Sequence, residues 1–200
     1  MEKLVDELLM QFKNQYSSSE SLELFSNCNG STQKYLSEKF TEEPIYKIES
    51  QIESCKKKRK SDKGNAYAFG QKLYANTKKD LSDLKSLLGS SDLKYKAIAD
   101  QLANEIMQCG IDYFNESLEN DSSDNYLESS QKLTKLANSI AVGELAKDRA
   151  KDSLATLADM KDRDLDQTIA FLQSVKDLYE KNEKDIRKQI EELKVSDYEL

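Results

Sequence analysis

Apolar residues recur at intervals of three and four between residues 90 and 119, which is the period of an amphipathic helix. The repeating positions are Ile98, Leu102, Ile106, Cys109, Tyr113 and Ser117, and Leu93, Phe114 and Leu118 widen the stripe. Ser90, Ser91 and Asp92 offer a helix cap before it, and Ala99, Ala103 and Gly110 leave room for neighbouring helices. We predict that this segment is the central core helix, with Leu102 and Ile106 fully buried.

The same period predicts helices on both sides of this segment. A short helix at 2–16 would turn Leu4, Leu8, Leu9 and Phe12 inward, and a second helix would run to a stop at Asn29-Gly30. Ser31 could cap a restart, although a continuous helix through Gly30 is an alternative. Pro44 predicts a new helix start, because proline is tolerated in a first turn. Further helices are expected at 65–88 and 126–142, with a loop at 120–125 between the central helix and the latter.

Neither Gly nor Pro occurs from residue 144 to residue 195, so this stretch predicts one helix about 75 Å long or two helices with a bend near 160–164. Apolar residues there are spaced by seven, at Leu165, Leu172, Tyr179, Ile186 and Leu193. A coiled-coil seam needs a second apolar position in each heptad. Ile169 and Ile190 supply it, but Lys176 and Glu183 do not. The stripe either packs on the rest of the bundle or binds a partner or its own copy, through Leu165, Ile169, Leu172, Tyr179 and Ile186.

The composition favours long, uninterrupted helices. The chain holds one Pro and six Gly among 200 residues, and 34% of its residues are charged. We predict an all-α fold, a bundle of about six to eight helices with a long C-terminal helix. It would form a single domain over 1–200, with a possible sub-division into a bundle at 1–120 and a helical hairpin or projecting helix at 121–200.

The net charge of −7 argues against a general nucleic-acid binder, which must neutralise phosphates with clustered cations. One basic run, Lys56, Lys57, Lys58, Arg59 and Lys60, is the exception. It could bind phosphate or another polyanion or serve as a nuclear import signal, or it could be the solvated C-terminus of a helix, where cations oppose the helix dipole. We expect the run to be exposed.

The absence of histidine excludes Ser-His-Asp and Cys-His catalysis and histidine-bearing metal sites. The three cysteines, at 28, 55 and 109, form no Cys-x-x-Cys pair and no disulfide framework. Gly64 to Lys72 matches a phosphate-binding loop poorly, and Gly70 more simply permits close helix contact. The N-terminus is acidic where a signal peptide would be apolar, which predicts a cytoplasmic protein, or a nuclear one if the chain is eukaryotic or viral.

These features together predict a non-catalytic helical protein–protein interaction module, such as an adaptor, a regulatory module or an assembly subunit, with a protein partner and no cofactor, metal or membrane span. The first alternative is a helical protein that contacts nucleic acid or another polyanion through Lys56 to Lys60. The second is a histidine-free enzyme with a carboxylate-only site.

Overall fold

The computed structural model describes residues 2–12, 15–16, 18–120 and 125–196. Within those residues the chain is all-α, with seven helices and no strand. The helices are α1 (Glu2–Phe12), α2 (Ser18–Leu24), α3 (Gly30–Ser61), α4 (Ala66–Leu88), α5 (Leu93–Glu119), α6 (Tyr126–Ile140) and α7 (Glu144–Ser196). The chain divides into two compact units, Met1–Ala155 and Thr156–Leu200, and α7 contributes to both. The predicted all-α bundle with a long C-terminal helix is confirmed.

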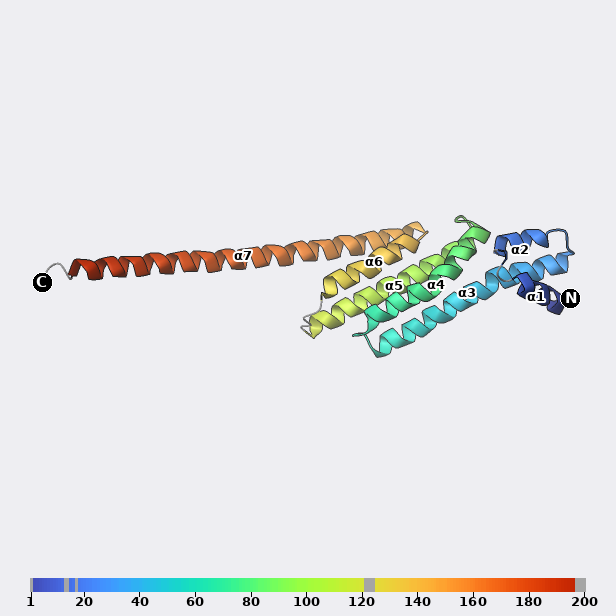
Figure 1. Cartoon of the computed structure of the whole chain (residues 1–200), viewed down its shortest axis with the longest axis horizontal. Helices are drawn as coiled ribbons and strands as arrows, with labels where there is room; N and C mark the ends of the chain where they lie inside the picture. The colour runs from blue at the N-terminus through green and yellow to red at the C-terminus, as the bar shows by residue number, and fades with distance from the viewer. Residues whose placement is uncertain (1, 13–14, 17, 121–124, 197–200) are drawn as a thin grey trace. The chain divides into compact units, whose positions relative to one another are not determined.

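Helix α5 lies at the centre of the first unit, beside α3, α4 and α6 (Figure 1). Asp92 caps it by accepting hydrogen bonds from the backbone N–H groups of Lys94 and Tyr95. Leu102 and Ile106 are completely buried, as the sequence predicted. The prediction was wrong at the margins of the stripe, where Leu93 and Leu118 are exposed. Leu93 is the first residue of the helix, before the turns that the neighbouring helices cover.

Three helices meet closely at Gly70 of α4. A methyl group added there would lie 2.9 Å from Cβ of Cys109 in α5 and 2.9 Å from a methyl carbon of Leu133 in α6. Atoms of this kind do not approach so closely, so only glycine permits the observed packing. One turn before Leu133 in α6, the hydroxyl of Ser130 donates a hydrogen bond of 2.9 Å to the carbonyl of Gly110 in α5. The sequence-based prediction of close contact at Gly70 is therefore confirmed.

A side chain of α5 fixes the turn between α6 and α7. The carboxylate of Asp100 accepts hydrogen bonds from the backbone N–H groups of Val142 at 2.8 Å and Gly143 at 3.0 Å. A Cβ at position 143 would lie 2.3 Å from that carboxylate, so glycine is needed at this turn. The first turns of α7 then bury Ala146 and Ala150 in the core of the first unit.

The N-terminal helices differ from the prediction in several places. Helix α2 ends at Leu24, before the stop predicted at Asn29-Gly30. The first helix ends at Phe12 rather than near residue 16, and it buries Val5 while Leu4 is 62% exposed. Asn29, not Ser31, caps α3 by accepting a hydrogen bond from the backbone N–H of Thr32.

Most of the loop predicted at 120–125 lies outside the described residues.

The helix start predicted at Pro44 was wrong, because α3 runs through this residue without interruption. An internal proline removes one backbone hydrogen bond and costs about 3 kcal/mol. Helix α3 nevertheless buries residues on both sides of the proline, Leu36 and Thr41 before it and Ile48 and Ile52 after it. Burial of a large apolar side chain contributes about 1.5–3 kcal/mol, so the three apolar members of this set offset the cost of the proline.

The central position of α5 predicts a large effect of truncation at its core. Ile106→Ala should lower the free energy of unfolding by about 2–5 kcal/mol, because the cavity it leaves is surrounded by close-packed helices. Leu93→Ala, at a position that is 81% exposed in the same helix, is the control and should change it by less than about 0.5 kcal/mol. Denaturant unfolding monitored by circular dichroism measures both values. A loss below about 1 kcal/mol for Ile106→Ala would contradict the central role of α5.

The contact at Gly70 predicts that Gly70→Ala destabilises the protein, although alanine favours helices over glycine by about 1 kcal/mol. The added methyl group must displace Cys109 or Leu133, and overpacking of this kind typically costs about 1–3 kcal/mol. Gly30→Ala, where an added Cβ meets nothing within 4 Å, should leave the stability unchanged or raise it. Thermal or denaturant unfolding of the two variants provides the comparison. Equal stability of the two would show that α4 does not approach α5 and α6 closely.

Candidate functional site

The basic run at 56–60 forms the last turns of α3 and does not form one exposed surface. Lys57, Lys58 and Lys60 are exposed, whereas Arg59 is only 7% exposed. The expectation that the whole run is solvated was therefore wrong at Arg59. This residue continues the buried stripe of α3, since it stands four residues after Cys55, and that spacing was a signal in the sequence.

Arg59 binds two carboxylates of α5. Its Nε lies 2.8 Å from one carboxylate oxygen of Glu105 and its Nη2 lies 3.3 Å from the other, a two-point contact. Its Nη1 donates to Asp112, whose second oxygen accepts a hydrogen bond of 2.9 Å from the side-chain amide of Gln108. The planar guanidinium suits this paired geometry better than a lysine ammonium would.

Burial of Arg59 alone would lower its pKa, because a charged group loses its hydration. The hydrogen bonds to Glu105 and Asp112 outweigh that effect and raise the pKa of Arg59 above its ordinary value. The guanidinium is thus held as a cation between two acidic side chains. Removing one member of such a buried network strongly lowers the stability of the fold, because the remaining charges are left without a partner.

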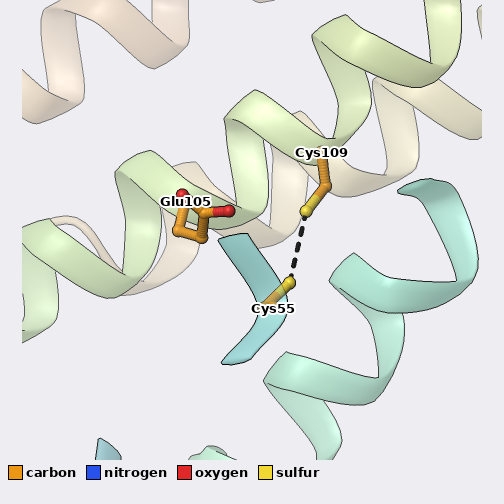
Figure 2. A group of neighbouring side chains, drawn as sticks. All are labelled: Cys55, Glu105 and Cys109. Atoms are coloured by element: carbon orange, nitrogen blue, oxygen red, sulfur yellow. Dashed lines mark hydrogen bonds between the residues drawn. The ribbon is translucent and has the colours of Figure 1, made fainter. Parts of the chain in front are cut away.

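Two cysteines meet beside this ion network. Figure 2 shows that the side chains of Cys55, from α3, and Cys109, from α5, point toward each other. Their Sγ atoms are 3.6 Å apart, both residues are buried, and neither is in a disulfide. Glu105 lies next to them, with a carboxylate oxygen within 4.8 Å of the sulfur atoms. No pattern in the sequence indicated that these two cysteines meet, because they are 54 residues apart and form no Cys-x-x-Cys pair.

The thiol–thiol contact affects the two cysteines in opposite directions. The hydrogen bond with Cys109 lowers the pKa of Cys55, and this effect outweighs burial and the nearby negative charge of Glu105. The hydrogen bond with Cys55, together with burial, raises the pKa of Cys109. Both shifts follow from this one contact, in which either thiol can donate.

Two thiols and a carboxylate are donors that zinc accepts. A closed structural zinc site has four donors, and within the described part of the chain no fourth Cys, Asp or Glu side chain joins this group. Both oxygens of Glu105 already accept hydrogen bonds from Arg59. A metal cation at this position would also be repelled by the positive charge of Arg59. Cys55 and Cys109 are therefore better described as a close pair of thiols than as ligands of a divalent cation.

A cavity of about 370 Å³ lies in the N-terminal part of the first unit, between α1, α2 and α3. Leu9, Phe12 and Phe40 supply much of its apolar lining. The charged residues among its described lining, Asp6 and Lys39, are bound to each other, and Tyr35 donates a second hydrogen bond of 2.7 Å to Asp6. These contacts attach α1 to α3, so the charges of the cavity are engaged in holding the helices together rather than directed at a ligand.

The predicted partner-binding residues of α7 lie in the second unit. Leu165, Ile169, Leu172, Tyr179 and Ile186 are all exposed, between 45% and 70%. Phe171, Val175, Leu178 and Ile190 are exposed as well. We refer to these nine residues as the α7 apolar face. The seven-residue spacing does not include Phe171 and Leu178, because they lie beside the seam. Their spacing of four and three residues from Val175 still places them on the same side of the helix.

No family model, no curated protein and no solved structure matches this chain. Among the described residues, no helix is both long enough and apolar enough to cross a membrane. Two features of the chain remain as candidate sites. One is the buried cluster of Arg59, Glu105, Asp112 and the two cysteines in the first unit, and the other is the α7 apolar face in the second unit.

The ion network predicts opposite outcomes for two neighbouring basic residues. Arg59→Ala should lower the free energy of unfolding by about 3–5 kcal/mol, because the buried Glu105 and the partly buried Asp112 would be left without a cation. Lys60→Ala, at the adjacent exposed position, should change it by less than about 0.5 kcal/mol. Urea unfolding measures both. Similar small losses would mean that Arg59 is solvated like its neighbours.

Proposed function

We propose that this chain is a non-catalytic helical protein–protein interaction module, and that the α7 apolar face pairs with the same face of a second copy in antiparallel orientation. The observation that carries the proposal is an apolar face of nine large side chains, all exposed, on a helix of the second unit. Contiguous exposed apolar surface of this kind marks interaction sites in proteins.

The order of charges along the seam favours an antiparallel second copy. Ile169, Lys176, Glu183 and Ile190 are spaced by seven and occupy one seam position of each heptad. In a parallel, in-register pair, Lys176 would face Lys176 of the second copy and Glu183 would face Glu183. In an antiparallel pair centred near residue 179, Lys176 of each copy lies within one helical turn of Glu183 of the other. Antiparallel pairing therefore replaces two like-charge contacts with two opposite-charge contacts.

The same centre brings the apolar ends of the seam together. Ile169 of each copy would lie near Ile190 of the other, and Leu172 near Ile186. Tyr179 would stand at the middle, where its large apolar ring is covered and its hydroxyl can still reach water. Lys176 and Glu183 also pair along their own helix, with Glu180 at 3.7 Å and Arg187 at 2.8 Å. These exposed pairs hold the charged side chains near the seam without burying them.

The alternatives have less support. A polyanion site at 56–60 would lack Arg59, which is engaged by two carboxylates. A carboxylate-only catalytic site has a candidate in Glu105 and Asp112, but both acids are bound to that same guanidinium and Glu105 is buried.

The proposal predicts a concentration-dependent dimer of the full chain, with a mass approaching twice 22.8 kDa in sedimentation velocity and light scattering. Leu172→Asp combined with Ile186→Asp should give a folded monomer with unchanged helical content, because both side chains are exposed on α7. A parent protein that remains monomeric across the micromolar range would sink the proposal, as would a dimer that survives the double substitution.

A charge-reversal series tests the orientation. Lys176→Glu should weaken association about tenfold, or about 1.4 kcal/mol, because the new carboxylate at position 176 would face Glu183 of the second copy. Adding Glu183→Lys should restore the association by reversing both charges. Lys181→Glu is the matched control, since it makes the same change of charge at an exposed position five residues on, which the helical period turns away from the seam. A parallel pair would lose nothing on Lys176→Glu, because it would exchange one like-charge contact for another.

A further inference from the structure

The buried pair formed by Cys55 and Cys109 is independent of the α7 apolar face and supports a separate inference. The two Sγ atoms are 3.6 Å apart and face each other across α3 and α5 (Figure 2). A disulfide requires about 2.05 Å between the sulfur atoms, so an approach of about 1.5 Å would allow the bond to form. We propose that Cys55 and Cys109 are a reversible redox site, at which hydrogen peroxide oxidises the two thiols to an intramolecular disulfide that joins α3 to α5.

The local environment assigns different roles to the two sulfur atoms. The contact with the thiol of Cys109 lowers the pKa of Cys55 and so favours its thiolate, which is the nucleophilic form. Burial and the same contact raise the pKa of Cys109 and keep it protonated at the start. Among the nearby charges, Glu105 raises the pKa of Cys55, and Arg59, one helical turn away, opposes it with a smaller effect. Cys55 also lines a small cavity whose described lining does not include Cys109, so Cys55 is the sulfur that attacks and Cys109 is the one that resolves.

A small cavity supplies the access that a buried nucleophile needs. It has a volume of about 40 Å³ and is lined by Cys55 together with Gln51, Lys58, Phe69, Lys72 and Asn76 of α3 and α4. A site of roughly 10–15 Å³ suffices for one water molecule, so this space suits a peroxide but not a bulky disulfide reagent. The polar ends of Gln51, Lys58 and Asn76 can hydrogen-bond to such a molecule.

The chemistry balances in two steps. The Cys55 thiolate attacks one peroxide oxygen, the O–O bond breaks, and the second oxygen leaves as hydroxide and takes up a proton to form water. Cys55 is now a sulfenic acid. The sulfur of Cys109 then attacks the sulfur of Cys55, its proton passes to the departing oxygen, and a second water leaves as the S–S bond forms. Two thiols and one peroxide thus give one disulfide and two waters, and a dithiol reductant reverses the change.

The first test uses the natural chain, in which Cys28 is a third, exposed thiol. After treatment with hydrogen peroxide, reductant-free digestion and mass spectrometry should find a peptide that links Cys55 to Cys109 within one molecule, and dithiothreitol should release it. Oxidation should also raise the melting temperature, because the bond closes a long loop of the unfolded chain. If native protein retains both thiols and they react only after unfolding, the proposal is overturned.

The order of attack is tested in a Cys28→Ser background, which removes the exposed thiol. Peroxide is removed before the oxidised protein is unfolded in dimedone, because the cavity at Cys55 is too small for dimedone to enter the folded chain. Cys109→Ala should then leave a sulfenic acid at Cys55 that dimedone traps, whereas Cys55→Ala should prevent trapping at Cys109. Trapping at Cys109 alone would overturn the assigned roles. Elemental analysis of the purified natural chain addresses the metal alternative. Stoichiometric zinc that is lost in both alanine variants would overturn the proposal, and a chain free of bound metal that forms the linked peptide would support it.

Discussion

Helices α4, α5 and α6 approach one another at Gly70 with no room for a methyl group, and the arrangement of the first unit depends on this contact. Cys109 and Leu133 occupy the space that a larger residue at position 70 would need. Because α5 is held there, its remaining faces are available to α3 and to the first turns of α7. The small residues Ala99, Ala103 and Gly110 serve the same purpose along the rest of α5, where all three are buried. Close approach increases the number of dispersion contacts, which stabilise a bundle whose surface is otherwise rich in charge.

The interface of α3 and α5 carries an ion network and a pair of thiols in neighbouring turns. One turn carries an arginine held by two acids, and the neighbouring turn carries two thiols in contact. A buried ion pair contributes little net stability when it is complete but makes partial occupancy costly, so it specifies one register of the two helices. That register is also what brings Cys55 and Cys109 together. The redox site proposed for these thiols therefore depends on the ion network beside it.

The second unit differs from the first in having few buried side chains among its described residues. From residue 158 to residue 191 all described side chains are exposed, and the nine residues of the α7 apolar face are among them. A helix that is apolar on one side and exposed throughout gains stability only when another surface covers it. Lys176 and Glu183 interrupt the seam and so weaken any pairing that aligns like charges. In the proposed antiparallel pair, these two charged residues favour one orientation of the helices, because each lies near the opposite charge of the other copy. Charged residues at the seams of coiled coils set orientation in the same way.

The sequence by itself determined the elements of this protein, because a helix is a local structure and its apolar period can be read over a few turns. The central helix at 93–119, its buried residues Leu102 and Ile106, and the small residue at Gly70 were all predictable in this way. The continuation of α3 through Pro44 was not, since local preference opposes it and only burial on both sides outweighs the cost. The buried position of Arg59 and the contact between Cys55 and Cys109 also required the tertiary structure. Their partners are about 50 residues away, and the packing register of two helices, which no local pattern encodes, decides which side chains meet.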